Sequence, residues 1–300
     1  MILQRDISKL SHRLYLEACA SVGKKNALRV QESVIERDYC LAWLLNVLAQ
    51  HPLLSGGLAF KGGTALRRVH FGEYRFSEDL DFTLQQPQEL DAIFAAFDEV
   101  FKTLREASGV SFRRSPDPQI RHQRNDTFHL LYKGPLLAEN SVKVDITRGE
   151  TIVFQLERKP ILRTYPEFAD LPEHRALLVY SFPEITVEKT LAITDDARRE
   201  PRDLYDLWYI QEAGHMPPPE ELIDGLGRKL ASREGRANDV LVPRLERAEK
   251  ILARTWDSRL RRQVQHLPEF EGCLRRVKRL LTNFDDLRRA ATYRAFRLSR

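Results

Sequence analysis

The chain has 300 residues, of which 42% are hydrophobic and 30% charged, a composition typical of a folded globular protein. No stretch approaches the roughly 20 apolar residues that are needed to span a bilayer. The first ten residues lack the apolar segment of a secretory signal. Three widely spaced cysteines, Cys19, Cys40 and Cys273, do not fit a disulfide framework or a zinc site. We therefore expect a cytoplasmic protein.

The net charge of +5 is unevenly distributed. From Leu241 to Arg300 there are 16 Lys and Arg against 7 Asp and Glu, a balance of +9, so the first 240 residues sum to −4. A basic C-terminal part indicates either a polyanionic partner or a helical bundle whose basic faces are simply solvated. Charge alone does not separate these two interpretations.

Periodicity predicts helices, then strands, in the first 150 residues. The first 50 or so residues are predicted to be helical, since leucines recur at helical spacing from Leu41 to Leu48 before His51-Pro52 ends the run. Alternation of apolar and polar residues later in the chain indicates strands. The predicted elements that follow are a strand at 58–60, a helix at 64–69, a strand at 79–84, a helix at 90–104 and strands at 110–113, 127–132 and 142–147.

The last three of these strands are separated by Pro, Asp, Asn and Gly, as an antiparallel meander requires. From Pro183 onward nearly everything is predicted to be helical, with breaks near 201, 216–219, 235 and 268. The sequence therefore predicts an α+β domain over residues 1–180 and a helical domain over residues 181–300.

A glycine pair is the first chemical signal. Lys61-Gly62-Gly63-Thr64 lies between a predicted strand and a predicted helix. Paired glycines let the backbone approach a ligand closely, and a helix start offers N–H groups to phosphate. The alternative is a turn that uses glycine for purely steric reasons.

Asp79 and Asp81 are the second signal, because residues two apart on a strand point to one face. Two carboxylates so placed can share Mg²⁺ ions, which prefer oxygen ligands. The alternative is a solvated strand face, although Asp is a poor strand former.

Asp145, in the strand-like run Val142 to Ile146, is the third signal. A two-metal phosphoryl-transfer site commonly uses a third carboxylate from a neighbouring strand. Lys143 shares the polar face, so the two residues also fit a simple exposed charge pair. Together the three signals fit one mechanism, in which Gly63 and Thr64 seat a triphosphate and the aspartates hold the metals.

The order strand, Gly-Gly-Thr, helix, strand with Asp-x-Asp, and a later strand carboxylate resembles the polymerase-β-like nucleotidyltransferases. More narrowly, Phe60 to Leu84 (FKGGTALRRVHFGEYRFSEDLDFTL) resembles the AbiEii/AbiGii toxin family, whose members include the mycobacterial MenT toxins. The resemblance implies a mixed sheet with flanking helices, followed by a C-terminal helical bundle.

The family has two further motifs, and both have matches here. Lys189 lies in ITVEKTLAI, and Asp203 and Asp206 lie in RDLYDLW. Helical spacing places all three on inward faces, where a charged group needs a partner or a ligand. The alternative is an internal Lys–Asp ion pair that joins two helices.

Carried over residue by residue, the resemblance implies a nucleotide-binding and metal-binding site. Asp79, Asp81 and Asp145 are expected to bind Mg²⁺ or Mn²⁺, with Asp145 in place of a family glutamate. Lys189 is expected to contact the triphosphate, and Asp206 is the essential aspartate, with Asp203 as its rival. Ser77 matches a serine that is modified in some members. The segment's other candidates for nucleotide binding are Lys61, Gly62, Gly63, Thr64 and Arg67.

The resemblance also implies a toxin of a toxin–antitoxin pair that uses an NTP, with an AbiEi-type antitoxin as a possible partner. Some members transfer nucleotides to the 3′ end of tRNA and block translation. The basic C-terminal clusters suit an RNA backbone. They comprise Arg275, Arg276, Lys278 and Arg279, then Arg288 and Arg289.

Three alternatives remain open. The same site can transfer a nucleotide to a protein or small molecule, or bind nucleotide or RNA without transfer. The C-terminal half can also serve as a protein-interaction bundle, which is compatible with catalysis.

Overall fold

The computed structural model describes the backbone of residues 1–298 and the side chains of residues 1–120 and 122–291. The chain divides into two compact units. The first comprises residues 1–150, 156–180 and 262–266, and the second comprises residues 151–155, 181–261 and those from 267 onward. Each unit therefore contains a short segment whose chain neighbours belong to the other.

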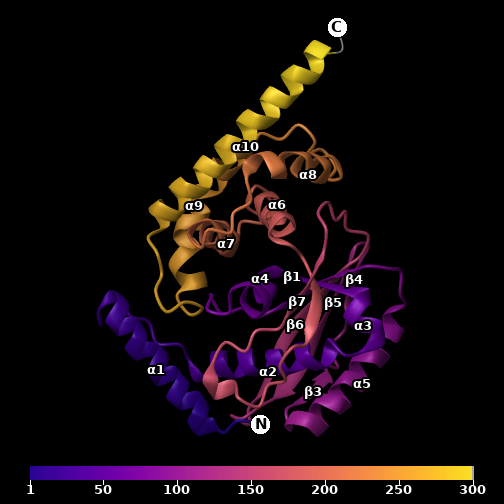
Figure 1. The fold of residues 1–300 in the computed structure, drawn as a ribbon, viewed down its shortest axis with the longest axis vertical. Helices are drawn as coiled ribbons and strands as arrows, with labels where there is room; N and C mark the ends of the chain where they lie inside the picture. Colours follow the sequence, from indigo (N-terminus) through magenta and orange to yellow (C-terminus); the bar gives the residue numbers. More distant parts are fainter. Residues whose placement is uncertain (299–300) are drawn as a thin grey trace. The chain divides into compact units, whose positions relative to one another are not determined.

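The first unit contains all the strands of the described chain (Figure 1). Its elements are α1 (Gln4–Val22), α2 (Glu32–Leu48), α3 (Pro52–Gly57), β1 (Leu58–Lys61), α4 (Gly62–Ala65), η1 (Leu66–Phe71), β2 (Leu80–Leu84), α5 (Leu90–Ser108), β3 (Ser111–Arg114), β4 (Ile120–His122), β5 (Asn125–Lys133), β6 (Glu139–Thr147), β7 (Glu157–Pro160), η2 (Pro166–Phe168) and β8 (Ala176–Val179). The second unit has the helices α6 (Phe182–Ile193), α7 (Pro201–Glu212), α8 (Pro219–Ala231), α9 (Leu241–Leu260) and α10 (Phe270–Leu298).

The strands of the described chain form one mixed eight-stranded sheet in the order β3-β5-β6-β2-β1-β8-β7, with β4 paired to β5. The β2–β6 and β1–β8 pairs are parallel and the others antiparallel. The predicted meander is confirmed, because β3, β5 and β6 pair antiparallel in sequence order. Strands β4, β7 and β8 were not predicted.

The core lies on one face of this sheet. Leu80 and Phe82 of β2 pair with Val144 and Ile146 of β6, and all four side chains are buried. Helices α2 and α5 pack against each other beside the sheet (Figure 1). Because side chains alternate along a strand, the residues between these apolar positions point to the opposite face. That opposite face carries the polar residues of the predicted site.

A buried charge cluster anchors the helix that follows β1. Asp38 of α2 accepts hydrogen bonds from Arg67 Nε at 2.7 Å and Arg68 Nε at 3.0 Å. Burial acts to raise the pKa of Asp38, but the two guanidinium groups outweigh it and hold the pKa below its usual value. Arg68 also exchanges backbone contacts with the chain at Leu162, whose N–H donates to its carbonyl at 2.7 Å.

The second unit is held by two buried polar clusters. Lys229 of α8 contacts Glu184 of α6 at 2.8 Å, and both are fully buried. The same Glu184 accepts the backbone N–H groups of Val153 and Phe154, which docks the segment 151–155 on this unit. A Cβ atom at Gly225 would overlap the Phe154 ring, so this helix position has room only for glycine.

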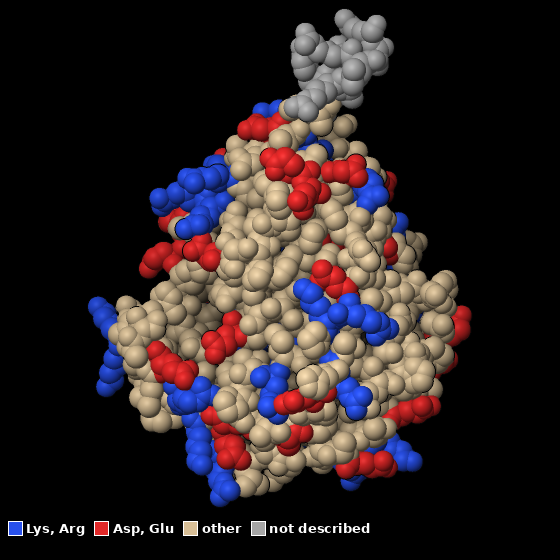
Figure 2. Space-filling model, viewed as in Figure 1, with Lys and Arg blue, Asp and Glu red and all other residues tan. Residues whose placement is uncertain are grey.

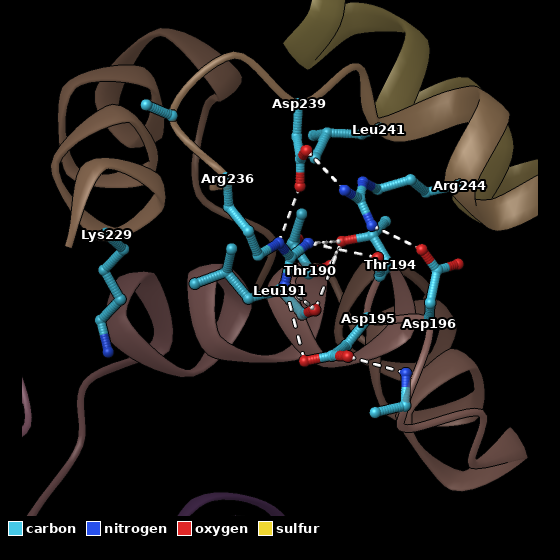
Figure 3. A network of polar contacts seen from close by, with 12 residues as sticks. Thr190, Leu191, Thr194, Asp195, Asp196, Lys229, Arg236, Asp239, Leu241 and Arg244 are labelled. Carbon is cyan, nitrogen blue, oxygen red and sulfur yellow. Dashed lines mark hydrogen bonds and ion pairs between the residues drawn. The ribbon is translucent and has the colours of Figure 1, made fainter. Parts of the chain in front are cut away.

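Arg236, in the loop before α9, is the centre of the second cluster (Figure 3). Its guanidinium donates to the carbonyls of Leu191 and Thr194 at the end of α6 and to Asp239 at 2.7 Å. Asp239 also accepts from Arg244 of α9 at 2.7 Å. These contacts satisfy the last carbonyls of α6, which have no partner within the helix. No helix of the described chain is long and apolar enough to cross a membrane.

We expect Asp38→Asn to lower the free energy of unfolding by about 3–5 kcal/mol, because it leaves two buried guanidinium groups without their counter-ion. Urea denaturation followed by circular dichroism measures the change. The matched control is Asp98→Asn, whose partner Arg114 lies at 3.1 Å in an exposed pair. That variant should change stability by less than about 1 kcal/mol. Equal effects of the two substitutions would contradict the assignment of Asp38 as an anchor.

Candidate active site

A row of polar residues crosses the sheet on the face opposite the core. Lys61 of β1 pairs with Asp81 of β2, Asp81 pairs with Asp145 of β6, and Asp145 pairs with Thr127 of β5. Directly paired residues project to the same side of a sheet, and neighbouring strands are roughly 4.8 Å apart. The register therefore brings Asp81 and Asp145, 64 positions apart in the printed sequence, next to each other.

The glycine pair closes around this row. Gly62 has φ +79°, a conformation that favours glycine, and a Cβ atom there would overlap the Asp81 carboxylate. A Cβ atom at Gly63 would lie 2.5 Å from Arg75 Nη2 and 3.0 Å from Ser77 Oγ. The absence of both side chains thus lets a carboxylate, a guanidinium and a hydroxyl approach the turn.

Thr64 holds the two motifs together. Its hydroxyl donates a hydrogen bond to the carbonyl of Asp79, and its side chain is buried. Asp79 lies immediately before β2, which begins at Leu80, and not within the strand as predicted. Thr64 thus fixes the backbone at the entry to β2, where both aspartates of the motif are found.

The negative charge of Asp145 is compensated by neighbours on the same face of the sheet. Its carboxylate lies 2.6 Å from Lys143 Nζ and accepts hydrogen bonds from Thr127 Oγ1 at 2.5 Å and Asn125 Nδ2 at 3.3 Å. Burial acts to raise the pKa of Asp145, but the Lys143 ammonium and these hydrogen bonds outweigh it, so the pKa lies below its usual value. The carboxylate is therefore ionised and fixed in orientation.

Lys143 interacts electrostatically with Asp79, Asp81 and Asp145. Partial burial lowers its pKa, but Asp145, Asp79 and Asp81 together outweigh this and raise it. The backbone carbonyl of Asp79 accepts from Thr64, whereas its carboxylate forms no hydrogen bond or ion pair with the described residues. Among the side chains that the structure describes, no three His, Cys, Asp or Glu groups gather closely enough to hold a metal ion. The Lys143 ammonium lies against Asp145, and the metal-binding role of the three aspartates stays a prediction.

Arg67 has a different position from the one expected. It was predicted to bind nucleotide, but its side chain is 1% exposed and its guanidinium is held by Asp38 and by the Tyr165 hydroxyl at 2.9 Å. It also donates to the carbonyl of Tyr74 and lies over the Phe76 ring at 3.7 Å. Arg67 therefore supports the loop that carries Arg75 and Ser77 from beneath.

Arg75 is a residue at the glycine turn for which the sequence predicted no role. It is 3% exposed, lies against Gly63, and donates from Nη1 to Gln263 Oε1 at 3.0 Å. In the sequence, Arg75 stands two residues before Ser77. Its contact with the glycine turn is not visible there, because it depends on the path of the loop between η1 and β2 and on a residue almost 190 positions away.

The lysine and aspartate motifs meet in the second unit. Lys189 Nζ of α6 lies 2.7 Å from Asp203 Oδ1 and 2.7 Å from Asp206 Oδ2 of α7, and all three residues are buried. Burial raises the pKa of Asp203, but Lys189 and Arg198 outweigh it and lower the pKa. This is the internal ion pair between two helices that the sequence left open. The roles of the three residues toward a nucleotide stay predictions.

A family model for the nucleotidyl transferase AbiEii toxin of type IV toxin–antitoxin systems matches residues 43–287. The chain belongs to the AbiEii family. It is accordingly a nucleotidyltransferase toxin of a type IV system, and the family implies a cognate antitoxin. The resemblance seen in the sequence is confirmed.

The fold of this AbiEii chain is also found in a solved structure. MenT4, a nucleotidyltransferase toxin from Mycobacterium tuberculosis, aligns with a TM-score of 0.60 over 92% of this chain and 89% of that chain. The two sequences are 20% identical, so the similarity concerns the fold. It confirms the predicted mixed sheet with flanking helices. No curated protein has significant sequence similarity to the chain.

We expect Thr127→Val to raise the pKa of Asp145 toward the ordinary value of 3.8, because a hydrogen bond to the ionised form is lost. Because the pKa of Asp145 is lowered by folding, its ionised carboxylate stabilises the folded state at pH values above its ordinary pKa. This stabilisation is lost as the pH falls through the pKa of the folded state. Carbon-13 NMR titration of the Asp145 carboxyl, assigned with Asp145→Asn, measures the midpoint. The control is Thr147→Val, whose hydroxyl contacts Asn125 instead, at 3.4 Å. An unchanged midpoint in Thr127→Val would exclude this role for the hydroxyl.

Proposed function

We propose that the chain is a metal-dependent enzyme that transfers a nucleoside monophosphate from an NTP to RNA. The proposed acceptor is the 3′ end of tRNA, and its modification would block translation. The observation that carries this proposal is the position of Asp81. It lies directly beside Asp145 across a parallel strand pair and against the backbone of Gly62. Carboxylates beside a glycine turn are the arrangement that phosphoryl transfer needs, since catalysis there is mainly positioning and charge neutralisation.

The residues of the first unit divide into two groups by charge. Arg75 and Lys61 are the cations at the glycine turn and suit the phosphate oxygens of the NTP. Asp79, Asp81 and Asp145 are the anions and suit the cation that accompanies a triphosphate. The Asp145 carboxylate, held by Thr127, keeps its orientation while the others bind.

Mg²⁺ or Mn²⁺ fits the donor set, because all three candidate ligands are hard carboxylate oxygens and an ammonium group, Lys143, already sits among them. When bound, such an ion would neutralise charge on the phosphates. For Asp145 to join Asp79 and Asp81 as a ligand, the Lys143 ammonium must first leave it.

The basic C-terminal helices support RNA as the acceptor, with less free charge than their composition suggests. Arg276 pairs with Glu212 at 2.6 Å, and Lys278 pairs with Glu246. Arg275 and Arg279 are exposed on α10 and have no acidic partner among the described residues. Acidic and basic side chains are interspersed over the visible surface (Figure 2). We therefore expect phosphate contacts by exposed arginines such as Arg275 and Arg279.

We expect Asp81→Asn to reduce nucleotide transfer by roughly 100-fold or more, because the carboxylate beside Gly62 is lost while the shape is kept. The measurement is labelling of total tRNA with each of the four NTPs in the presence of Mg²⁺. The control is Glu139→Gln, which removes an exposed carboxylate at the far end of β6. A wild-type chain that folds but labels no RNA with any NTP would contradict the proposal. Labelling of an added protein or aminoglycoside instead would identify a different acceptor.

We expect Lys143→Met to bind Mn²⁺ about tenfold more tightly, because the ammonium that competes for Asp145 is gone; a tenfold change corresponds to about 1.4 kcal/mol. Titration of the free protein followed by electron paramagnetic resonance measures the affinity without NTP or RNA. The control is Lys133→Met, which removes an exposed lysine at the end of β5. Equal affinities of Lys143→Met and the wild type would show that Lys143 does not compete with the metal.

A further inference from the structure

The loop between α9 and α10 packs on the first unit, although both helices belong to the second. Residues 262–266 make this contact. Gln263 and Val264 are buried, and the carbonyl of Gln265 accepts the N–H of Leu28 at 3.1 Å. A polar side chain that is buried in a loop needs a partner, and the partner of Gln263 is next to the site.

Gln263 binds two consecutive residues of the loop before β2. Its backbone carbonyl accepts the N–H of Phe76 at 2.7 Å, and its side-chain Oε1 accepts from Arg75 Nη1 at 3.0 Å. Arg67 holds the other side of the same loop through the Tyr74 carbonyl and the Phe76 ring. The loop from Tyr74 to Phe76 is thus held from two directions.

The orientation of Arg75 follows from these contacts. A guanidinium group is planar and rigid, so a hydrogen bond at one terminal nitrogen restricts where the other can lie. Gln263 holds Nη1, and Nη2 lies against Gly63, within 2.5 Å of where a Cβ atom would be. The amide of Gln263 therefore helps to orient Arg75, together with the Phe76 carbonyl, which accepts from the same Nη1 at 3.4 Å.

We propose that Gln263 is a positioning residue for the nucleotide triphosphate, acting through Arg75. It holds the guanidinium beside Gly63, where Nη2 binds a phosphate oxygen of the NTP. The inference rests on the proposed function, because it takes the glycine turn as the seat of the triphosphate. It adds a residue from the C-terminal part of the chain to a site whose motifs lie between Lys61 and Asp145.

The test is a double-mutant cycle with Gln263→Met and Arg75→Met. Gln263→Met keeps the length of the side chain and the backbone carbonyl but removes the acceptor. We expect it to raise KM for the NTP by roughly tenfold with little change in kcat, the lower end of the effect of a partner that orients a binding group. In the Arg75→Met background the same substitution should have no further effect on KM.

Nucleotide affinity is measured in parallel by titration with a non-hydrolysable NTP analogue, and folding by thermal denaturation. The control is Gln265→Met, whose contact with Leu28 uses only the backbone carbonyl. A merely structural Gln263 would lower stability and leave KM additive with that of Arg75→Met, which would overturn the inference. An unchanged KM in Gln263→Met would also overturn it.

A second variant covers the case in which Gln263→Met does not fold. Gln263→Glu keeps an acceptor at the same length, so it should fold, but its charge competes with phosphate for Arg75 and should weaken analogue binding. Unchanged affinity in this variant would overturn the inference. If the wild-type chain itself binds no NTP analogue, the proposed function fails. If the wild type binds and the Gln263 variants bind equally well, only this inference fails.

Discussion

The parallel pairing of β2 with β6 places Asp81 directly beside Asp145, which is an unfavourable arrangement of like charges. The register is held by the other face of the same strands, where Leu80, Phe82, Val144 and Ile146 are all completely buried. A slip of β2 by one residue would turn Leu80 and Phe82 away from the core and Asp81 towards it. The hydrophobic core thus keeps two carboxylates together, and Lys143 and Thr127 reduce the cost at Asp145.

The glycine turn and the loop before β2 need a second constraint, since neither is part of the sheet. Asp38 supplies it by holding Arg67, which in turn contacts Tyr74 and Phe76. A buried pair of this kind adds little net stability but costs a great deal when one partner is removed. Its value here lies in fixing the loop that presents Arg75 and Ser77 to Gly63. The buried Asp38–Arg67 pair therefore fixes the loop whose residues Arg75 and Ser77 lie against Gly63.

The sequence was sufficient where local pattern decides structure. Alternation along β2, β5 and β6 predicted the strands, and the motifs around Gly62 and Asp81 predicted the family. Strand β7 was missed because Glu-Arg-Lys-Pro has no apolar alternation, and it exists only by pairing with β8. The buried place of Arg67 and the contact of Arg75 with Gln263 depend on residues distant in sequence. No local pattern encodes such partners, so one role was expected wrongly and the other was not seen.

The short segment 262–266 belongs to the first unit, and this has a consequence for the order in which the protein is made. The N-terminus of a chain leaves the ribosome first, and domains generally fold as they emerge. Every strand of the described residues has been synthesised by residue 180, but Gln263 and its neighbours have not. The loop that carries Arg75 therefore lacks its last support until most of the helical unit has also been made. A toxin built in this way cannot complete its first unit before residue 266 has been synthesised.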